Sequence, residues 1–216
     1  MTDVAVAPTD LIADVSAPPS EPAPAPTGNP ATVGVPTFIV GSVALGMVLI
    51  GVVPATAVGA SIPIILAATG VGQLVAAVWA SSLGQNAVAA IFGIFSGFWF
   101  SYAALVLGLT HNWYGVGADN AVATQEVFLT SWLVVIVLLT LATLRLPAAF
   151  TLLFALIDLA LVLVLIATAQ GSSAVQTAAG WVVFAFAAVG AYLFFDAMST
   201  STGGRALPIG RPVLGG

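Results

Sequence analysis

The sequence predicts an all-α membrane protein, a bundle of six transmembrane helices preceded by a disordered N-terminal tail. Two observations predict this fold class. Hydrophobic residues make up 60% of the chain and charged residues 5%, whereas a soluble domain carries roughly 25% charged residues. The apolar residues also form six continuous stretches, each close to the ~20 residues that a helix needs to cross a bilayer. A protein surface in contact with water needs more charged residues than this chain has. The composition therefore indicates that many of the apolar residues face lipid.

Helix-breaking or polar residues separate the six stretches. Pro54 ends the first stretch, a polar segment at 110–125 follows the third, and Arg145 and Pro147 separate the fourth from the fifth. A polar turn around Gly171 precedes the sixth. The expected spans are 35–53, 58–80, 87–109, 126–144, 148–169 and 175–198. The expected division of the chain is a tail at 1–28, a transmembrane domain at 29–210 and a C-terminal tail at 211–216.

The N-terminal tail differs in composition from the rest of the chain. It holds Asp3, Asp10, Asp14 and Glu21, and proline recurs through 17–26. Closely spaced prolines oppose both helix and strand, so we expect this segment to be disordered or polyproline-like. It lacks the basic start and the continuous apolar stretch of a signal peptide.

The three basic residues predict the orientation in the membrane. Arg145 lies between the fourth and fifth spans, and Arg205 and Arg211 follow the sixth. With six spans, all three fall on the same side as both termini. Positively charged loops mark the cytoplasmic side. We therefore expect both termini to be cytoplasmic and the loop that holds His111 and Asp119 to face outward.

Two polar residues inside the spans are candidates for function. Asp158 lies near the centre of the fifth span, where a carboxylate costs ~2.5–3.5 kcal/mol on insertion scales. It is either a proton-accepting group beside a solute path or an acid that is hydrogen-bonded to a neighbouring helix. Gln73 lies inside the second span, next to small residues. Its amide either contacts a substrate or forms a hydrogen bond between helices.

Other function classes lack the residues that they need. The chain contains no cysteine and one histidine, so neither a thiolate nor a multi-histidine metal site is expected. Three basic residues are too few for nucleic-acid binding, which needs clustered Lys and Arg. No nucleophile–base pair or phosphate-cradling loop is present. We therefore expect no enzyme activity, no cofactor and no metal, and elimination leaves transport across the membrane.

Three segments resemble one family, the acetate uptake transporters (YaaH/SatP-like). Residues 29–34, Asn-Pro-Ala-Thr-Val-Gly, resemble a signature ahead of the family's first helix, with Thr32 in place of its second proline. Residues 92–103, rich in aromatic and small residues, resemble its third span, and 204–210 resemble its C-terminal Leu-Pro-Ile-Gly ending. The similarity runs in register from Asn29 to the end of the chain and leaves the Pro-rich tail outside.

The resemblance implies a function and a site. It implies uptake of acetate and related short carboxylates across the inner cell membrane, either as a channel-like uniporter or coupled to protons. It also implies a homo-oligomer, a hexamer, with a path through each protomer. The family's apolar constriction falls on Phe38, Phe95 and Ile157, where the family often has Tyr in place of Phe95. Because no Arg or Lys ring is available, the helix start at Asn29 and side-chain amides would attract the anion.

Two alternatives to carboxylate transport stay open at the level of sequence. One is a channel for another small solute, such as ammonia, water or glycerol. The other is a non-transporting membrane scaffold or sensor, which predicts no flux in liposomes. If an apolar constriction is the barrier, the carboxylate crosses as the neutral acid or together with a proton, so we expect acetate and protons to move together.

Overall fold

The computed structural model describes residues 27–215 and is helical apart from turns, loops and one isolated β-bridge. Six segments of the described chain are long and apolar enough to cross a membrane, so the predicted fold class is confirmed. The helices are α1 (Ala31–Leu49), η1 (Ala55–Ser61), η2 (Ile64–Gly70), α2 (Val71–Ser82), α3 (Asn86–Thr110), η3 (Ala118–Asn120), α4 (Ala121–Thr143), α5 (Ala148–Gln170) and α6 (Ser173–Ser201). The tail predicted to be disordered lies outside the described residues, apart from Thr27 and Gly28.

Two predicted helix starts are wrong. The first helix begins at Ala31 instead of residue 35, because Asn29 Oδ1 accepts a hydrogen bond from the Ala31 N–H at 3.1 Å and satisfies a free donor of the first turn. The fourth helix begins at Ala121 instead of residue 126, so part of the expected polar loop is helical. The short turn η3 leads directly into this helix.

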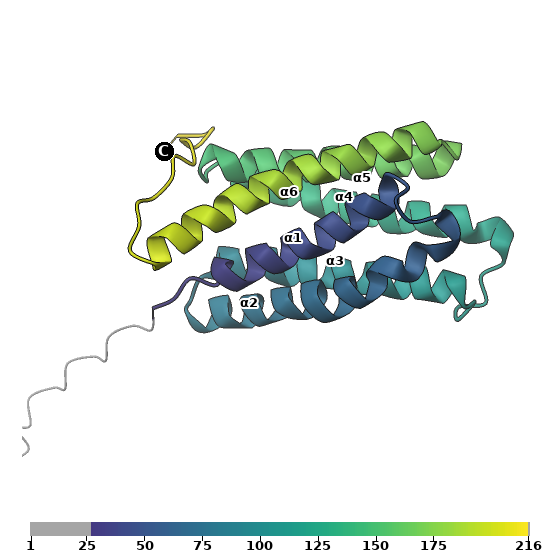
Figure 1. Ribbon diagram of the computed structural model, residues 1–216, viewed down its shortest axis with the longest axis horizontal. Coiled ribbons are helices and arrows are strands. Elements are labelled where there is room, and N and C mark those ends of the chain that lie inside the picture. The colour runs from purple at the N-terminus through teal and green to yellow at the C-terminus, as the bar shows by residue number, and fades with distance from the viewer. Residues whose placement is uncertain (1–26, 216) are drawn as a thin grey trace, which may run out of the picture.

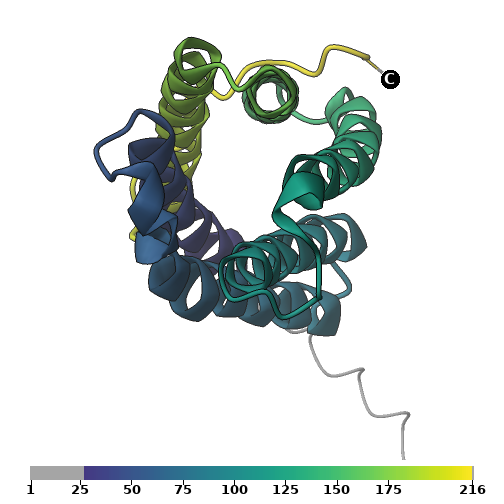
Figure 2. The same cartoon turned by 90° about the vertical axis from the view of Figure 1, so that its right-hand side faces the viewer.

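The six spans form a ring when the molecule is viewed along the helices (Figure 2). Neighbours in the chain pack side by side, and α1 closes the ring by packing against α6 (Figure 1). The contact between α3 and α4 is sparse. Because each odd-numbered span begins at the end of the bundle where the chain enters α1, the starts of α1, α3 and α5 lie together.

Glycines allow the helices around α1 to approach closely. A Cβ atom at Gly34 would collide with the ring of Phe92, and one at Gly41 would collide with Thr69. Such approach of backbones is a common means of helix association in membranes.

The turn between α5 and α6 is set by two residues. Gly171 adopts a left-handed φ of 60° and ends α5. Ser172 Oγ then accepts a hydrogen bond from the Val175 N–H at the start of α6.

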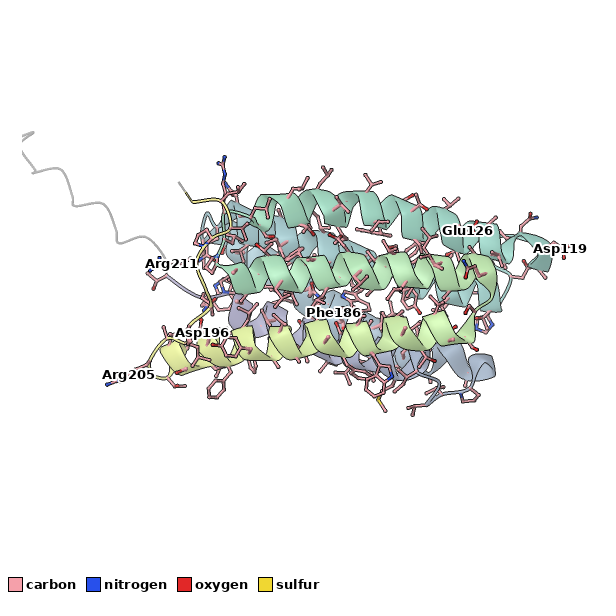
Figure 3. All side chains as sticks on the ribbon, turned by 90° about the horizontal axis from the view of Figure 1, so that it is seen from above. Asp119, Glu126, Phe186, Asp196, Arg205 and Arg211 are labelled. Carbon is pink, nitrogen blue, oxygen red and sulfur yellow. The ribbon has the colours of Figure 1, made fainter. Side chains whose placement is uncertain are left out.

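Apart from Asp158 in the middle of α5, the charged residues among those described lie at the two ends of the bundle. Figure 3 shows Asp196, Arg205 and Arg211 at one end and Asp119 and Glu126 at the other, with Phe186 between them. The C-terminal segment runs back along the end that carries the arginines. It is held there by hydrogen bonds from Ala149 N to Ile209 O at 3.0 Å and from Leu214 N to Leu144 O at 2.9 Å. Arg145, next to Leu144, therefore lies at the same end.

Candidate functional site

A cavity of about 280 Å³ lies in the half of the bundle near the arginines. Its wall is built from the first turns of α1, α3 and α5, together with parts of α2 and α6. The lining is apolar except for two amides, Asn29 and Gln73. No charged side chain of residues 27–215 lines it. By the same measure of volume a single water needs about 10–15 Å³, so the space suits a small carboxylate with several waters.

Aromatic rings close the inner end of this wide cavity. The rings of Phe38 and Phe95 meet edge to face with centroids 5.3 Å apart, a favourable arrangement for aromatic pairs. Ile157 completes the closure from α5, and all three side chains are buried, with 4–7% of their surface exposed. These are the residues that the family resemblance implies for the constriction, and the structure brings them together.

A second, smaller cavity of about 40 Å³ lies on the far side of these residues. Its wall consists of apolar side chains from α1, α3, α4, α5 and α6. Three residues line both cavities, namely Phe38, Phe95 and Ile157. They therefore form the partition between the two spaces, and a solute that moves from one to the other must pass them.

Gln73 is the polar group deepest in the wide cavity. Its side chain is fully buried, with 0% of its surface exposed, and neither its amide oxygen nor its amide nitrogen has a hydrogen-bond partner among the described residues. A buried polar group without a partner costs roughly 1–3 kcal/mol. The interhelical hydrogen bond that the sequence left open as an alternative is therefore absent among the described residues, which leaves the amide as a candidate contact for a solute in this cavity.

Asn29 and the starts of three helices lie at the mouth of the cavity. Asn29 lies at the rim, and Ala31, Ala87 and Leu146 line the cavity from the starts of α1 and α3 and from just ahead of α5. Free backbone N–H groups and the helix dipole make a helix start attractive to anions. At α1 the N–H groups of Ala31, Thr32 and Val33 already bond oxygens of Asn29 and Pro30, so the attraction that this mouth offers an anion is that of the helix dipoles.

Asp158 lies apart from both cavities. Its Oδ2 accepts a hydrogen bond of 2.6 Å from Thr140 Oγ1, so the carboxyl faces α4 instead of the centre of the ring. Neither cavity includes it in its wall. Of the two roles that the sequence leaves open for Asp158, this geometry favours the hydrogen bond to a neighbouring helix.

We therefore expect Asp158→Asn to leave acetate uptake close to that of the unaltered protein. The asparagine keeps an oxygen that accepts from Thr140, and the change lies outside the path. Thr140→Val removes the donor and should lower the melting temperature instead, since a buried hydrogen bond contributes about 0.5–1.5 kcal/mol. Acetate uptake per molecule of folded protein checks the prediction for Asp158→Asn, and thermal unfolding in detergent checks the prediction for Thr140→Val. Loss of uptake in a well-folded Asp158→Asn variant would give the carboxyl a role in transport.

Two further aromatic residues pack against the partition, Phe154 on the side of the wide cavity and Phe186 on the side of the smaller one. Phe154 places its ring 5.7 Å from that of Phe95, and Phe186 places its ring 5.6 Å from that of Phe38. Phe154 lies three residues before Ile157 and so on the same face of its helix, which is a signal that the sequence did contain. Phe186 is brought in by the packing of α6 against α1, for which the sequence holds no comparable signal.

The chain is similar to known proteins in both sequence and structure. The sequence model of the GPR1/FUN34/yaaH family matches residues 14–205. The chain belongs to the GPR1/FUN34/yaaH family. The match begins at residue 14 of the N-terminal tail, ahead of Asn29, where the resemblance in the sequence begins.

The fold of this family member is also found in a solved structure. A structure titled "Structure of the bacterial acetate channel SatP" aligns with a TM-score of 0.75 and 22% sequence identity. The alignment covers 86% of this chain and 100% of that chain. No curated protein matches the chain.

Within residues 27–215, no group of three or more His, Asp or Glu side chains is placed to hold a metal ion.

Proposed function

We propose that this protein carries acetate and related short-chain monocarboxylates across the cell membrane through a path in each protomer. The observation that supports this most is the pair of cavities joined at Phe38, Phe95 and Ile157, with the Gln73 amide unpartnered in the wider one. An amide nitrogen donates to a carboxylate, and the apolar remainder of the wall suits a short alkyl group. Membership of the family and the shared fold of an acetate channel support the same substrate.

We also propose that a proton accompanies the carboxylate through the partition. An ion stripped of its water between aromatic and aliphatic side chains pays a large desolvation cost. The wall of the smaller cavity supplies no charge to offset that cost. A neutral acid avoids it, so release of acetate at the far side would also release the proton.

We further propose that both termini are cytoplasmic and that the protein assembles as a homo-oligomer. Three arginines at the end of the bundle that carries the wide cavity support a cytoplasmic location for that end and for both termini. Large apolar side chains on the outer face of α4, such as Val134 and Leu138, are more than half exposed. They suit contact with lipid or with another protomer of a homo-oligomer, which the family resemblance implies to be a hexamer. Native mass measurement in lipid-like detergent tests the assembly.

Uptake of radiolabelled acetate into proteoliposomes tests the proposed function. Protein-free liposomes are the control, because neutral acetic acid also crosses lipid unaided. We expect protein-dependent uptake that unlabelled propionate competes with and that glycerol and urea leave unchanged. We also expect an inside-alkaline pH difference to increase it. Uptake of glycerol or ammonia in place of acetate would favour another solute channel, and absence of any flux would favour a scaffold or sensor.

A further inference from the structure

The second membrane span changes helix type just before Gln73. A π-helical segment, η2, runs over Ile64–Gly70 and gives way to the α-helix α2 at Val71. π-helical hydrogen bonds join residues five apart and close wider turns than α-helical ones, and such segments are rare and frequent at functional sites. The direction in which Gln73 projects therefore depends on the residue at which the π-helix ends.

A hydrogen bond from the third span marks that residue. Ser96 Oγ donates to the carbonyl oxygen of Gly70 at 2.9 Å. The Ser96 side chain is 3% exposed, so the bond lies in a dry environment where water does not compete. Gly70 is the last residue of the π-helix, and Gln73 follows it by less than one helical turn.

Close packing holds the same turn from both sides. A Cβ atom at Gly70 would come within 2.7 Å of the Phe100 ring on α3. One at Gly72 would collide with Thr37 on α1. The backbone that leads into Gln73 is therefore held between two helices, with the Ser96 hydroxyl as its hydrogen-bonded attachment to α3.

The Gln73 amide itself has no such attachment. Neither of its polar atoms is bonded to another described residue, so its direction comes from the backbone before it. We propose that Ser96 is a positioning residue for the Gln73 amide, acting through the Gly70 carbonyl to direct that amide into the wide cavity. This inference rests on the proposed function, in which Gln73 binds the carboxylate.

Transport kinetics test the inference in proteoliposomes. We expect Ser96→Ala to raise the KM for acetate roughly two- to twelvefold, the range for one buried hydrogen bond, with little change in maximal rate. Ser96→Thr keeps a hydroxyl and should restore the KM. Ser101→Ala is the matched control, because the Ser101 hydroxyl bonds Phe98 O within its own helix. If Ser96→Ala fails to fold, Ser96→Cys replaces the hydroxyl with a weaker hydrogen-bond donor of similar shape and should raise the KM in the same direction.

A double variant separates positioning from a general structural role. If Ser96 acts through Gln73, then Ser96→Ala adds nothing to the KM of Gln73→Leu, because the group that it positions is already gone. If the factors by which Ser96→Ala and Gln73→Leu each raise the KM multiply in the double variant, the inference is wrong.

A second measurement does not depend on transport. The chain contains no cysteine, so Gln73→Cys provides a single thiol for a water-soluble thiol reagent. We expect Ser96→Ala to slow labelling of that thiol severalfold and Ser101→Ala to leave it unchanged. Equal labelling rates with and without Ser96→Ala would overturn the positioning role. If the unaltered protein moves no acetate, the proposed function fails, and the labelling rates still decide whether Ser96 directs position 73.

Discussion

Replacing Gln73 with leucine should raise the KM for acetate by roughly 10- to 150-fold, because a hydrogen bond to a charged group contributes about 1.5–3 kcal/mol. Leucine is close to glutamine in size but neither donates nor accepts. The amide is one of two polar side chains that line the wide cavity and the one that is fully buried. Its loss therefore removes the polar contact nearest the partition.

The same substitution should make the protein more stable. The buried amide of Gln73 has no partner among the described residues, and such a group destabilises the fold by about 1–3 kcal/mol, which an apolar side chain of similar shape would recover. Weaker binding together with a higher melting temperature is the combination expected of a ligand-binding group. A structural amide would show the opposite change in stability.

Uptake kinetics and thermal unfolding of the same preparation check this prediction. Gln125→Leu is the matched control, since the Gln125 amide bonds Ala121 O within α4 and lines neither cavity. We expect the control to leave the KM unchanged. A Gln73→Leu variant that melts at a lower temperature and transports acetate with an unchanged KM would assign the amide to packing.

Replacing Phe95 with alanine should open the partition to larger solutes. The Phe95 ring separates the two cavities and contacts the rings of Phe38 and Phe154. Its removal would join the two spaces. Fit to an apolar wall commonly discriminates between substrates by about 10- to 200-fold, so we expect uptake of a bulky monocarboxylate such as benzoate, relative to acetate, to rise by roughly tenfold or more. The lost packing should lower stability by about 3–5 kcal/mol.

Phe184→Ala controls for the loss of packing alone. Phe184 on α6 packs near Gly46 and Trp181 and lines neither cavity. The Phe184→Ala substitution should lower the stability of the protein without changing the ratio of benzoate to acetate uptake. Both variants are assayed at a temperature at which their thermal unfolding curves show them to be folded. Unchanged selectivity in a folded Phe95→Ala variant would place the barrier elsewhere.

Hydropathy predicts the six spans because each must be continuously apolar to lie in lipid. It predicts their ends less well. The start of α1 depends on the Asn29 side chain, which accepts from Ala31, and the start of α4 includes polar residues that also suit a loop. The π-helix at Ile64–Gly70 carries no signal in hydrophobic periodicity, because every residue of the segment except Thr69 is apolar.

The direction of a side chain around its helix is harder to predict than its depth. Asp158 and Ile157 are neighbours in the sequence, but Ile157 faces the cavities whereas Asp158 faces Thr140 on α4. A span that is apolar all round has no polar face to show which side points inward. The partition residues could be assigned ahead of the structure because of the family resemblance. Phe154 could have been added to them because it shares a helix face with Ile157, whereas Phe186 required the packing of α6 against α1.

The central claim is that acetate passes between Phe38, Phe95 and Ile157, and blocking that point chemically tests it most directly. Ile157→Cys in this cysteine-free chain places one thiol at the partition, within reach of a small methanethiosulfonate reagent from the wide cavity. We predict that complete modification abolishes most protein-dependent acetate uptake in proteoliposomes and that excess acetate slows the modification. Complete modification with unchanged uptake would contradict the account.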